Sequence, residues 1–262
     1  MFPGRAPLAA ADRNGAHALS TTLQGQLLPT QGWASYIKNR LVKTLDFSSP
    51  NPDRWVVLDV ESSGLNPKKD RLISIAATAI VFDAQRRPRI SLTDTFEVVI
   101  KQPPEIVDMI EFEAIDKNNI LIHGIGIGAQ QKGVKAEVAL SEFLRYVGHS
   151  PLIAFHSWFD EILINKALRK VLGRTTHRHW LDLEHLAAVL HKENHQLPLD
   201  VWMQRYGIEC EQRHQAAADV LATAQLLMKL WPMLQKRKAA DWKGVKTIAG
   251  GLKTLPGRNL PT

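Results

Sequence analysis

Hydrophobic residues concentrate first in three runs, at residues 55–61, 71–82 and 91–100. These runs are rich in Val, Ile and Thr and are bounded by polar or proline-containing segments, a pattern typical of β-strands. The polar segment "DAQRRPR" separates the second run from the third. The pattern therefore predicts a three-stranded meander.

Farther along the chain, helical spacing of apolar residues alternates with short strand-like runs. Helices are predicted near 136–147, 158–171, 183–192, 198–206 and 214–234, and strands at 151–155 and near 179–182. Gly207 suits the end of the fourth helix, and Pro232 marks the approximate end of the last one. Alternating strands and helices favour an α/β fold.

The two ends of the chain differ from this pattern. Residues 1–30 have no sustained period and are predicted to be loop or disorder, whereas the apolar positions 33, 37, 41 and 45 predict a helix near 33–47. The Gly-, Pro- and Lys-rich residues 239–262 predict a flexible basic tail. We expect an N-terminal extension at 1–50, a main domain at 51–238 and a tail at 239–262.

Composition narrows the class of protein. The hydrophobic content of 45% supports a sizeable core, and the single cysteine, Cys210, excludes a disulfide within the chain. With neither a secretory leader nor an apolar run long enough to span a membrane, we expect a cytoplasmic protein without a membrane partner. Arginines among alanines near the start leave organelle targeting as a weaker alternative.

The net charge of +7 is uneven. Residues 1–50 hold five basic and two acidic side chains and residues 239–262 hold four and one, which leaves +1 for the middle. Basic ends can attract polyanions such as nucleic acid, but they are equally typical of solvated, disordered segments. Charge alone leaves both interpretations open.

Two carboxylates end the first strand, in "WVVLDVESSGL". Residues two apart in a strand face the same side, so Asp59 and Glu61 project together. Two neighbouring anions are costly to bury unless a cation compensates, and Mg²⁺ or Mn²⁺ are suitable partners. The alternative is an exposed strand end without a ligand.

Further candidate ligands lie after the next strand and near the last helix. Asp160 follows the apolar run "LIAF", although an aspartate is also common in the first turn of a helix. His214 and Asp219 are five residues apart, which on one helix would separate them by about 140°. If His214 lies in the loop before the helix, both side chains can reach one site.

Together these motifs resemble the DEDDh family of 3'-5' exonucleases, which includes the proofreading epsilon subunit of bacterial DNA polymerase III. The resemblance spans residues 55 to about 230 and rests on "LDVESSGL", "AFHSWFD" and "HQAAAD", in that order, with "IHGI" at 122–125 after the first. It implies a ribonuclease H-like fold, with a mixed central sheet flanked by helices.

The resemblance also implies the chemistry. Asp59, Glu61, Asp160 and Asp219 would hold two Mg²⁺ or Mn²⁺ ions around the scissile phosphate, and His214 would be the general base. A histidine with an ordinary pKa of about 6.5 suits proton transfer near neutral pH. Other histidines, including His185 and His191, are predicted to face solvent rather than to bind zinc.

Contacts to the terminal nucleotide follow from the same resemblance. The predicted substrate-binding residues are Glu61, Ser62, Ser63, Gly64, Leu65, His123, His156 and Trp158. Many relatives have Thr-Thr where this chain has Ser62-Ser63, and His-Asn where it has Phe155-His156. Trp158 could stack on a base, whereas Phe159 fits the apolar face of its helix and is predicted to be core.

The leading functional hypothesis is a metal-dependent exonuclease that removes nucleoside 5'-monophosphates from the 3' end of DNA, with single strands favoured. An RNA-directed 3'-5' exonuclease is the enzymatic alternative, and a non-catalytic nucleic-acid-binding protein is the alternative of another class. A role in proofreading or repair, and a polymerase or clamp partner, are suggested only faintly; "QGQLLP" near residue 24 resembles a clamp-binding peptide.

Overall fold

The structure, a computed structural model, describes residues 51–103, 105, 114–176, 179–210 and 212–254. The helix predicted near 33–47 and the "QGQLLP" segment lie outside these residues. In the described part of the chain, none of the helices has the length and apolar character that crossing a bilayer requires.

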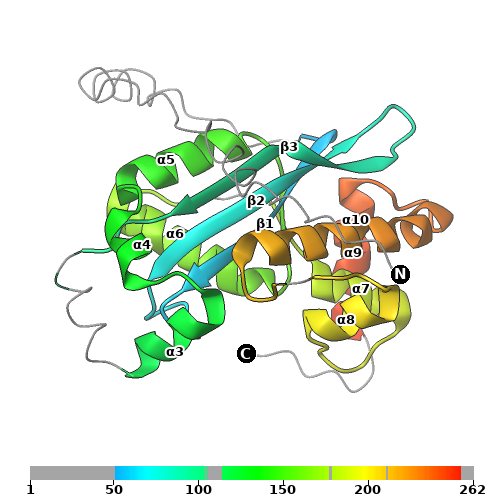
Figure 1. The fold of residues 1–262 in the computed structure, drawn as a ribbon. Helices are drawn as coiled ribbons and strands as arrows, with labels where there is room; N and C mark the ends of the chain where they lie inside the picture. The colour runs from blue at the N-terminus through cyan, green and yellow to red at the C-terminus, as the bar shows by residue number, and fades with distance from the viewer. Residues whose placement is uncertain (1–50, 104, 106–113, 177–178, 211, 255–262) are drawn as a thin grey trace, which may run out of the picture. The chain divides into compact units, whose positions relative to one another are not determined.

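The centre of the fold is a five-stranded sheet with the strand order β3-β2-β1-β4-β5 (Figure 1). Its strands are β1 (Arg54–Ser62), β2 (Leu72–Phe82), β3 (Pro88–Val99), β4 (Leu152–Ala154) and β5 (Trp180–Asp182). The first three form an antiparallel meander, and β4 and β5 run parallel to β1. The predicted meander and the mixed sheet are confirmed.

Helices follow the strands in the predicted alternation. They are α3 (Ala114–His123), α4 (Ile127–Lys132), α5 (Ala136–Val147), α6 (Ser157–Leu172), α7 (Leu183–His191), α8 (Leu199–Tyr206), α9 (Ala216–Lys236) and α10 (Trp242–Gly250), followed by the 3₁₀ turn η1 (Gly251–Thr254). Gly207 ends α8 with a left-handed φ of 62°, as glycine after a helix commonly does. The sequence did not predict α3 and α4.

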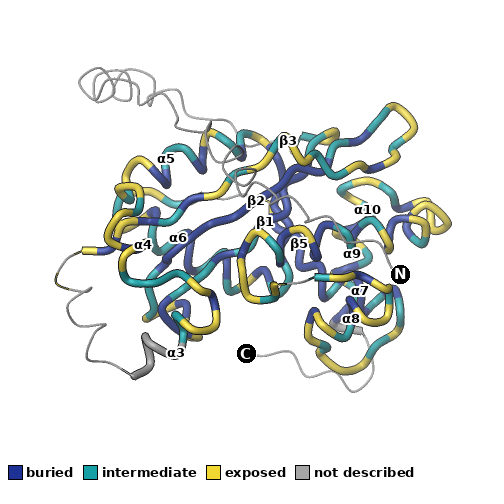
Figure 2. Tube along the Cα trace, viewed as in Figure 1, coloured by how far each residue is buried: buried dark blue, intermediate teal, exposed yellow. Residues whose placement is uncertain are grey.

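Each face of the sheet buries its own core, because neighbouring residues of a strand point to opposite sides. Val57 packs with the helices α7 to α10, whereas Val56 and Leu58 pack with α5 and α6. The central strands β1 and β2 are consequently largely buried, whereas the edge strand β3 is exposed or half-buried at most positions (Figure 2). This burial explains why β1 has a continuous hydrophobic run, and it makes any charged residue on the strand exceptional.

Two predictions near the C-terminus are wrong. The helix α9 does not end at Pro232 but continues to Lys236, since proline removes one backbone hydrogen bond without ending the packing of the helix. Residues 242–250, predicted as part of a flexible tail, form α10, whose Val245 is fully buried against the α7 side of the core. The proposed domain boundary near residue 50 stays a prediction.

Candidate active site

Asp59 and Glu61 lie at the end of β1, where they face the same side of the sheet. They pair with Ala76 and Ser74 of β2, so small neighbours leave room above both carboxylates. The register shifts directly after Glu61, and β1 ends one residue later. The strand therefore delivers two carboxylates to one edge of the sheet.

Asp160 reaches the same edge by a short connection. The strand β4 is parallel to β1, and α6 begins three residues after β4 ends, which puts the first turn of α6 beside the end of β1. His156 makes this sharp turn with a φ of 64°. The Asp160 side chain is buried and accepts a hydrogen bond from the backbone of Val60, between the two β1 acids.

His214 and Asp219 come from the start of α9. His214 precedes the helix in a left-handed conformation and is exposed, and its backbone N–H donates to Asp219 Oδ2 over 3.2 Å. Asp219, in the first turn, is buried. The start of α9 is tied to β1 because the Ala216 backbone donates a hydrogen bond to Glu61. His214 lies in the loop before α9, as the sequence analysis required for it to reach the same site as Asp219.

Asp59, Glu61, His214 and Asp219 line a cavity of about 210 Å³. Its wall combines acidic residues, the exposed histidine, the β1–β2 loop and one face of α3. The lining residues are Asp59, Val60, Glu61, Ser62, Gly64, Leu65, Asn119, Ile122, His123, Phe159, His214 and Asp219. Asp160 is not among the lining residues, but it is close enough to Asp59 for the charge of that carboxylate to raise its pKa.

Negative charge is crowded here. Burial, reinforced by the charge of Asp219, raises the pKa of Asp59 to about 8. Burial and the neighbouring Asp59 and Asp219 raise the pKa of Glu61 to about 9, and burial together with Asp59 raises the pKa of Asp160 well above its usual value. At neutral pH the site holds protons that ordinary carboxylic acids would have lost.

One cation partly offsets this charge. Arg213 lies next to His214 and forms ion pairs with Asp219 and with Asp200 of α8. Burial opposes the charge of the guanidinium, but hydrogen bonds to both carboxylates outweigh it and raise the pKa of Arg213. The attraction of Arg213 lowers the pKa of Asp59 and Glu61 by less than burial and the other acids raise it.

The donor set fits a hard divalent cation. Carboxylate oxygens are the ligands preferred by Mg²⁺ and Mn²⁺, and here those of Asp59 and Glu61 from β1 and of Asp219 from α9 line one cavity. Burial, together with the neighbouring acids, raises the pKa of Asp59 and Glu61, so added positive charge would stabilise their ionised forms. A bound divalent ion would supply that charge in place of the protons.

The structure separates the predicted substrate-binding residues into two groups. Ser62, Gly64, Leu65 and His123 line the cavity with Glu61, whereas Ser63, His156 and Trp158 do not. The Ser63 side chain is buried and accepts a hydrogen bond from the Arg71 backbone over 3.0 Å, so it closes the β1–β2 loop rather than facing a substrate. Contacts from His156 and Trp158 to a nucleotide stay predictions.

Gly64 is needed for a close approach in this loop. A Cβ atom at residue 64 would lie 2.6 Å from Asp70 Oδ2, and that oxygen is held by the Asn66 backbone N–H at 2.7 Å. Leu65, by contrast, is 91% exposed at the cavity mouth. An exposed leucine beside half-buried and buried acids gives the cavity an apolar rim.

Besides Val60, three lining residues were missed from the sequence. Asn119 and Ile122 lie on α3 one turn apart, and Asn119 also donates a hydrogen bond to the Ser63 carbonyl. Their spacing with His123 places all three on one helical face, a signal that could have found them. Phe159, predicted as core, does pack against the α5–α6 side of the core but also lines the cavity.

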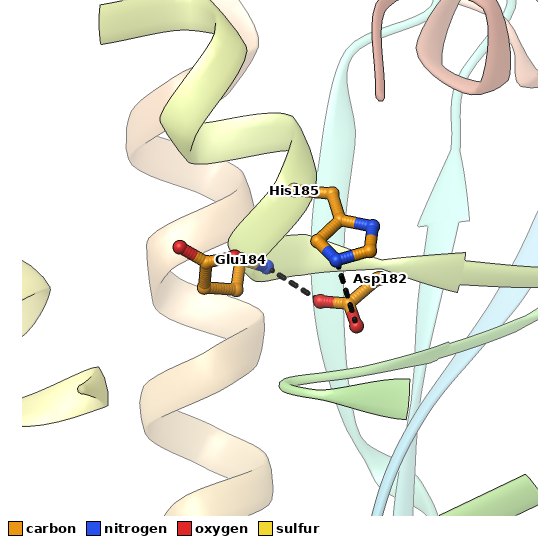
Figure 3. A group of neighbouring side chains, drawn as sticks. All are labelled: Asp182, Glu184 and His185. Carbon is orange, nitrogen blue, oxygen red and sulfur yellow. Dashed lines mark hydrogen bonds and ion pairs between the residues drawn. The ribbon is translucent and has the colours of Figure 1, made fainter. Parts of the chain in front are cut away.

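A further group of candidate ligands, two acids and a histidine, lies at the end of β5. Ligand atoms of Asp182, Glu184 and His185 lie within 4.8 Å of one another, and His185 Nε2 is 3.8 Å from Asp182 (Figure 3). Asp182, however, is engaged by backbone N–H groups. It accepts hydrogen bonds from residues 156, 157 and 184, at 3.2, 2.9 and 3.0 Å. Asp182 thereby caps α6 and α7 and fixes the turn that carries Asp160.

Comparisons with known proteins agree with this geometry. The model of the exonuclease family called RNase T matches residues 56–227. The PolC-type DNA polymerase III of Thermotoga petrophila is 29% identical over 182 residues, which cover 70% of this chain and 12% of that protein. The PolC-type enzyme of Clostridium perfringens is 27% identical over 197 residues, which cover 75% of this chain and 12% of that enzyme.

Solved structures share the fold. Exonuclease I of E. coli in complex with a dT13 oligonucleotide superposes with a TM-score of 0.57 at 17% identity, covering 71% of this chain and 42% of that one. Exonuclease I of Methylocaldum szegediense gives a TM-score of 0.51 at 18% identity, covering 71% and 41%. This chain therefore spans less than half of the exonuclease I chains and a small part of the polymerases.

Proposed function

Because the chain belongs to the RNase T exonuclease family, we propose that it is a metal-dependent 3'-5' exonuclease that hydrolyses DNA from the 3' end and releases nucleoside 5'-monophosphates. The observation that carries this proposal is the cavity that Asp59, Glu61, Asp219 and the exposed His214 line together. A small cavity at the end of a strand suits one terminal nucleotide better than the middle of a duplex.

The four acids are assigned to Mg²⁺ or Mn²⁺. Asp59, Glu61 and Asp219 would be ligands on the cavity wall, and Asp160 would complete the set from α6. Two such ions, when bound, would neutralise the phosphodiester and stabilise the attacking and departing oxygens. The protein itself would mainly hold the carboxylate ligands in place and so position the ions against the scissile phosphate.

His214 is assigned the role of general base. It is exposed on the cavity wall and stands on a loop, so its imidazole can accept the proton of the attacking water. The backbone N–H of the same residue holds Asp219, which ties the position of the base to that of a ligand. Glu61, Ser62, Gly64, Leu65 and His123 would surround the terminal nucleotide.

Single-stranded DNA is the proposed substrate. Its support is that the PolC-type relatives are DNA polymerases and that the exonuclease I structures contain dT13 or dA16 oligonucleotides. The family name favours one alternative, an RNA-directed 3'-5' exonuclease. A cytoplasmic location and a role beside a polymerase or clamp in proofreading or repair belong to the proposal as well, with no partner specified.

The test is digestion of 5'-labelled single-stranded DNA and RNA of one sequence with Mg²⁺, Mn²⁺ or EDTA. We expect metal-dependent shortening of DNA from the 3' end, faster than that of RNA. Asp59→Ala should abolish it, and His214→Ala should slow it by about 10²- to 10⁴-fold, the usual contribution of a general base. Asp53→Asn, an exposed carboxylate outside the cavity lining, is the matched control.

Two results would contradict the proposal. If both Asp59→Ala and His214→Ala kept full activity, the assignment of the active site to this cavity would be wrong. If activity in EDTA equalled that in Mg²⁺ or Mn²⁺, the reaction would not depend on a metal ion. Faster digestion of RNA would favour the alternative substrate and leave the site assignment intact.

A further inference from the structure

Arg213 lies between two carboxylates that differ in their exposure to solvent. Its Nε donates to Asp200 Oδ1 over 2.6 Å and its Nη2 lies 3.5 Å from Asp200 Oδ2, while its Nη1 forms an ion pair with Asp219 Oδ1. Asp200 is 58% exposed on α8, whereas Asp219 is 11% exposed in the cavity. The guanidinium therefore joins a surface anchor to a proposed metal ligand.

Both oxygens of Asp219 are engaged by neighbouring residues. Arg213 holds Oδ1, and the backbone N–H of His214 holds Oδ2 at 3.2 Å. A guanidinium and a divalent cation repel each other, and both seek the same carboxylate oxygens. Binding of a metal ion to Asp219 and the ion pair from Arg213 are consequently competing states.

We propose that Arg213 is an internal counterion of the metal site: it neutralises Asp219 while no metal is bound, and metal binding displaces it from Asp219 while Asp200 retains it. This inference rests on the proposed function, because it takes Asp219 as a metal ligand. The displacement is local, since the contacts of Nε and Nη2 to Asp200 do not involve Asp219.

The two anchors of Arg213 lead to opposite expectations for two variants. Without the guanidinium, in Arg213→Gln, the metal ion has no competitor for Asp219, so metal binding should strengthen. Without the charge of Asp200, in Asp200→Asn, the guanidinium has Asp219 as its remaining anionic partner, so metal binding should weaken. A purely structural clasp between α8 and α9 would instead make both variants change in the same direction.

The experiment is calorimetric titration of the 262-residue chain with Mn²⁺ in the absence of nucleic acid, with thermal unfolding in EDTA and in Mn²⁺. We expect Arg213→Gln to bind Mn²⁺ about fivefold or more tightly than wild type, and Asp200→Asn to bind it less tightly, as for sites coupled through one group. Arg213→Gln should also lower the melting temperature more in EDTA than in Mn²⁺. Arg205→Gln is the matched control, because this α8 arginine pairs with Glu193 instead.

The outcomes separate this inference from the proposed function. If wild type binds Mn²⁺ but Arg213→Gln binds it equally or more weakly, the counterion role is refuted and the exonuclease proposal stands. If both variants melt lower by equal amounts in EDTA and in Mn²⁺, Arg213 is only a structural clasp. If wild type binds no Mn²⁺, the metal-dependent function and this inference are both wrong.

Discussion

Replacing Asp59 by Asn should stabilise the metal-free protein although it destroys the proposed activity. The pKa of Asp59 is about 8 in the folded chain because the half-buried carboxylate is desolvated and lies near Asp219. An acid whose pKa is higher when folded than when unfolded favours the folded state only while it stays protonated. The stability of the metal-free protein should therefore fall as pH rises from about 4 to about 8.

The size of the effect follows from the same shift. Moving the pKa from 3.8 to about 8 corresponds to about 6 kcal/mol at about 1.4 kcal/mol per pKa unit. Because Asp59 faces a water-accessible cavity, we expect about a third of this, or about 2 kcal/mol, to be gained by Asp59→Asn near pH 8. For a domain of this size that gain raises the melting temperature by about 4–8 °C.

The assay compares thermal unfolding of wild type and Asp59→Asn in EDTA between about pH 5 and about pH 9. The difference between the two proteins should widen with pH, and saturating Mn²⁺ should remove it by stabilising wild type. Asp53→Asn, an exposed control 71% accessible, should follow wild type at every pH. If Asp59→Asn melts below wild type at all pH values in EDTA, the ionised carboxylate is stabilising and the electrostatic reasoning is wrong.

Three further outcomes can be checked with single variants. Asp182→Ala should lower the free energy of unfolding by about 2–4 kcal/mol in urea denaturation, because it leaves buried N–H groups at two helix starts unsatisfied; an unchanged midpoint would contradict its capping role. Gly64→Ala should raise KM for single-stranded DNA, because its Cβ would meet Asp70 at 2.6 Å, and Asp70→Ala in the same chain should partly reverse this. Leu65→Ala should raise KM several-fold with a change in stability below about 0.5 kcal/mol, as for exposed side chains; an unaltered KM would exclude it from substrate binding.

Much of the fold can be predicted from the sequence, because strands that are covered on both faces of the sheet contain long apolar runs that are easy to recognise. Residues 55–58 of β1 are fully buried and β2 is buried at all but one position, so both strands contain apolar stretches that are easily recognised. The helix α10 gives a weak signal because it is short and contains Gly244. That glycine is needed because a Cβ would lie 2.6 Å from the Ala239 backbone, a tertiary contact that local sequence does not reveal.

The candidate site is only partly predictable for a related reason. Asp59 and Glu61 follow from strand alternation, and Asp160 follows from its place after a strand. The meeting of α9 with β1 does not follow from spacing. It depends on contacts such as the hydrogen bond from Ala216 to Glu61, which join residues far apart in the chain. Without the family resemblance, His214 and Asp219 would have remained an ordinary loop histidine and helix aspartate.

The negative charges of the acids at this edge of the sheet are balanced by different groups. This difference indicates which acids would gain most from a bound cation. Asp182 has three backbone N–H groups, and Asp219 has Arg213 and the His214 N–H. For Asp59 and Glu61, burial and nearby charge outweigh every attractive contact, so their pKa values lie at about 8 and about 9. A divalent ion bound between these two residues gains the most, since it replaces protons rather than an existing ion pair. Metal affinity should thus depend on pH through the β1 carboxylates and on Arg213 through Asp219, two contributions that Mn²⁺ titrations of Arg213→Gln at two pH values can separate.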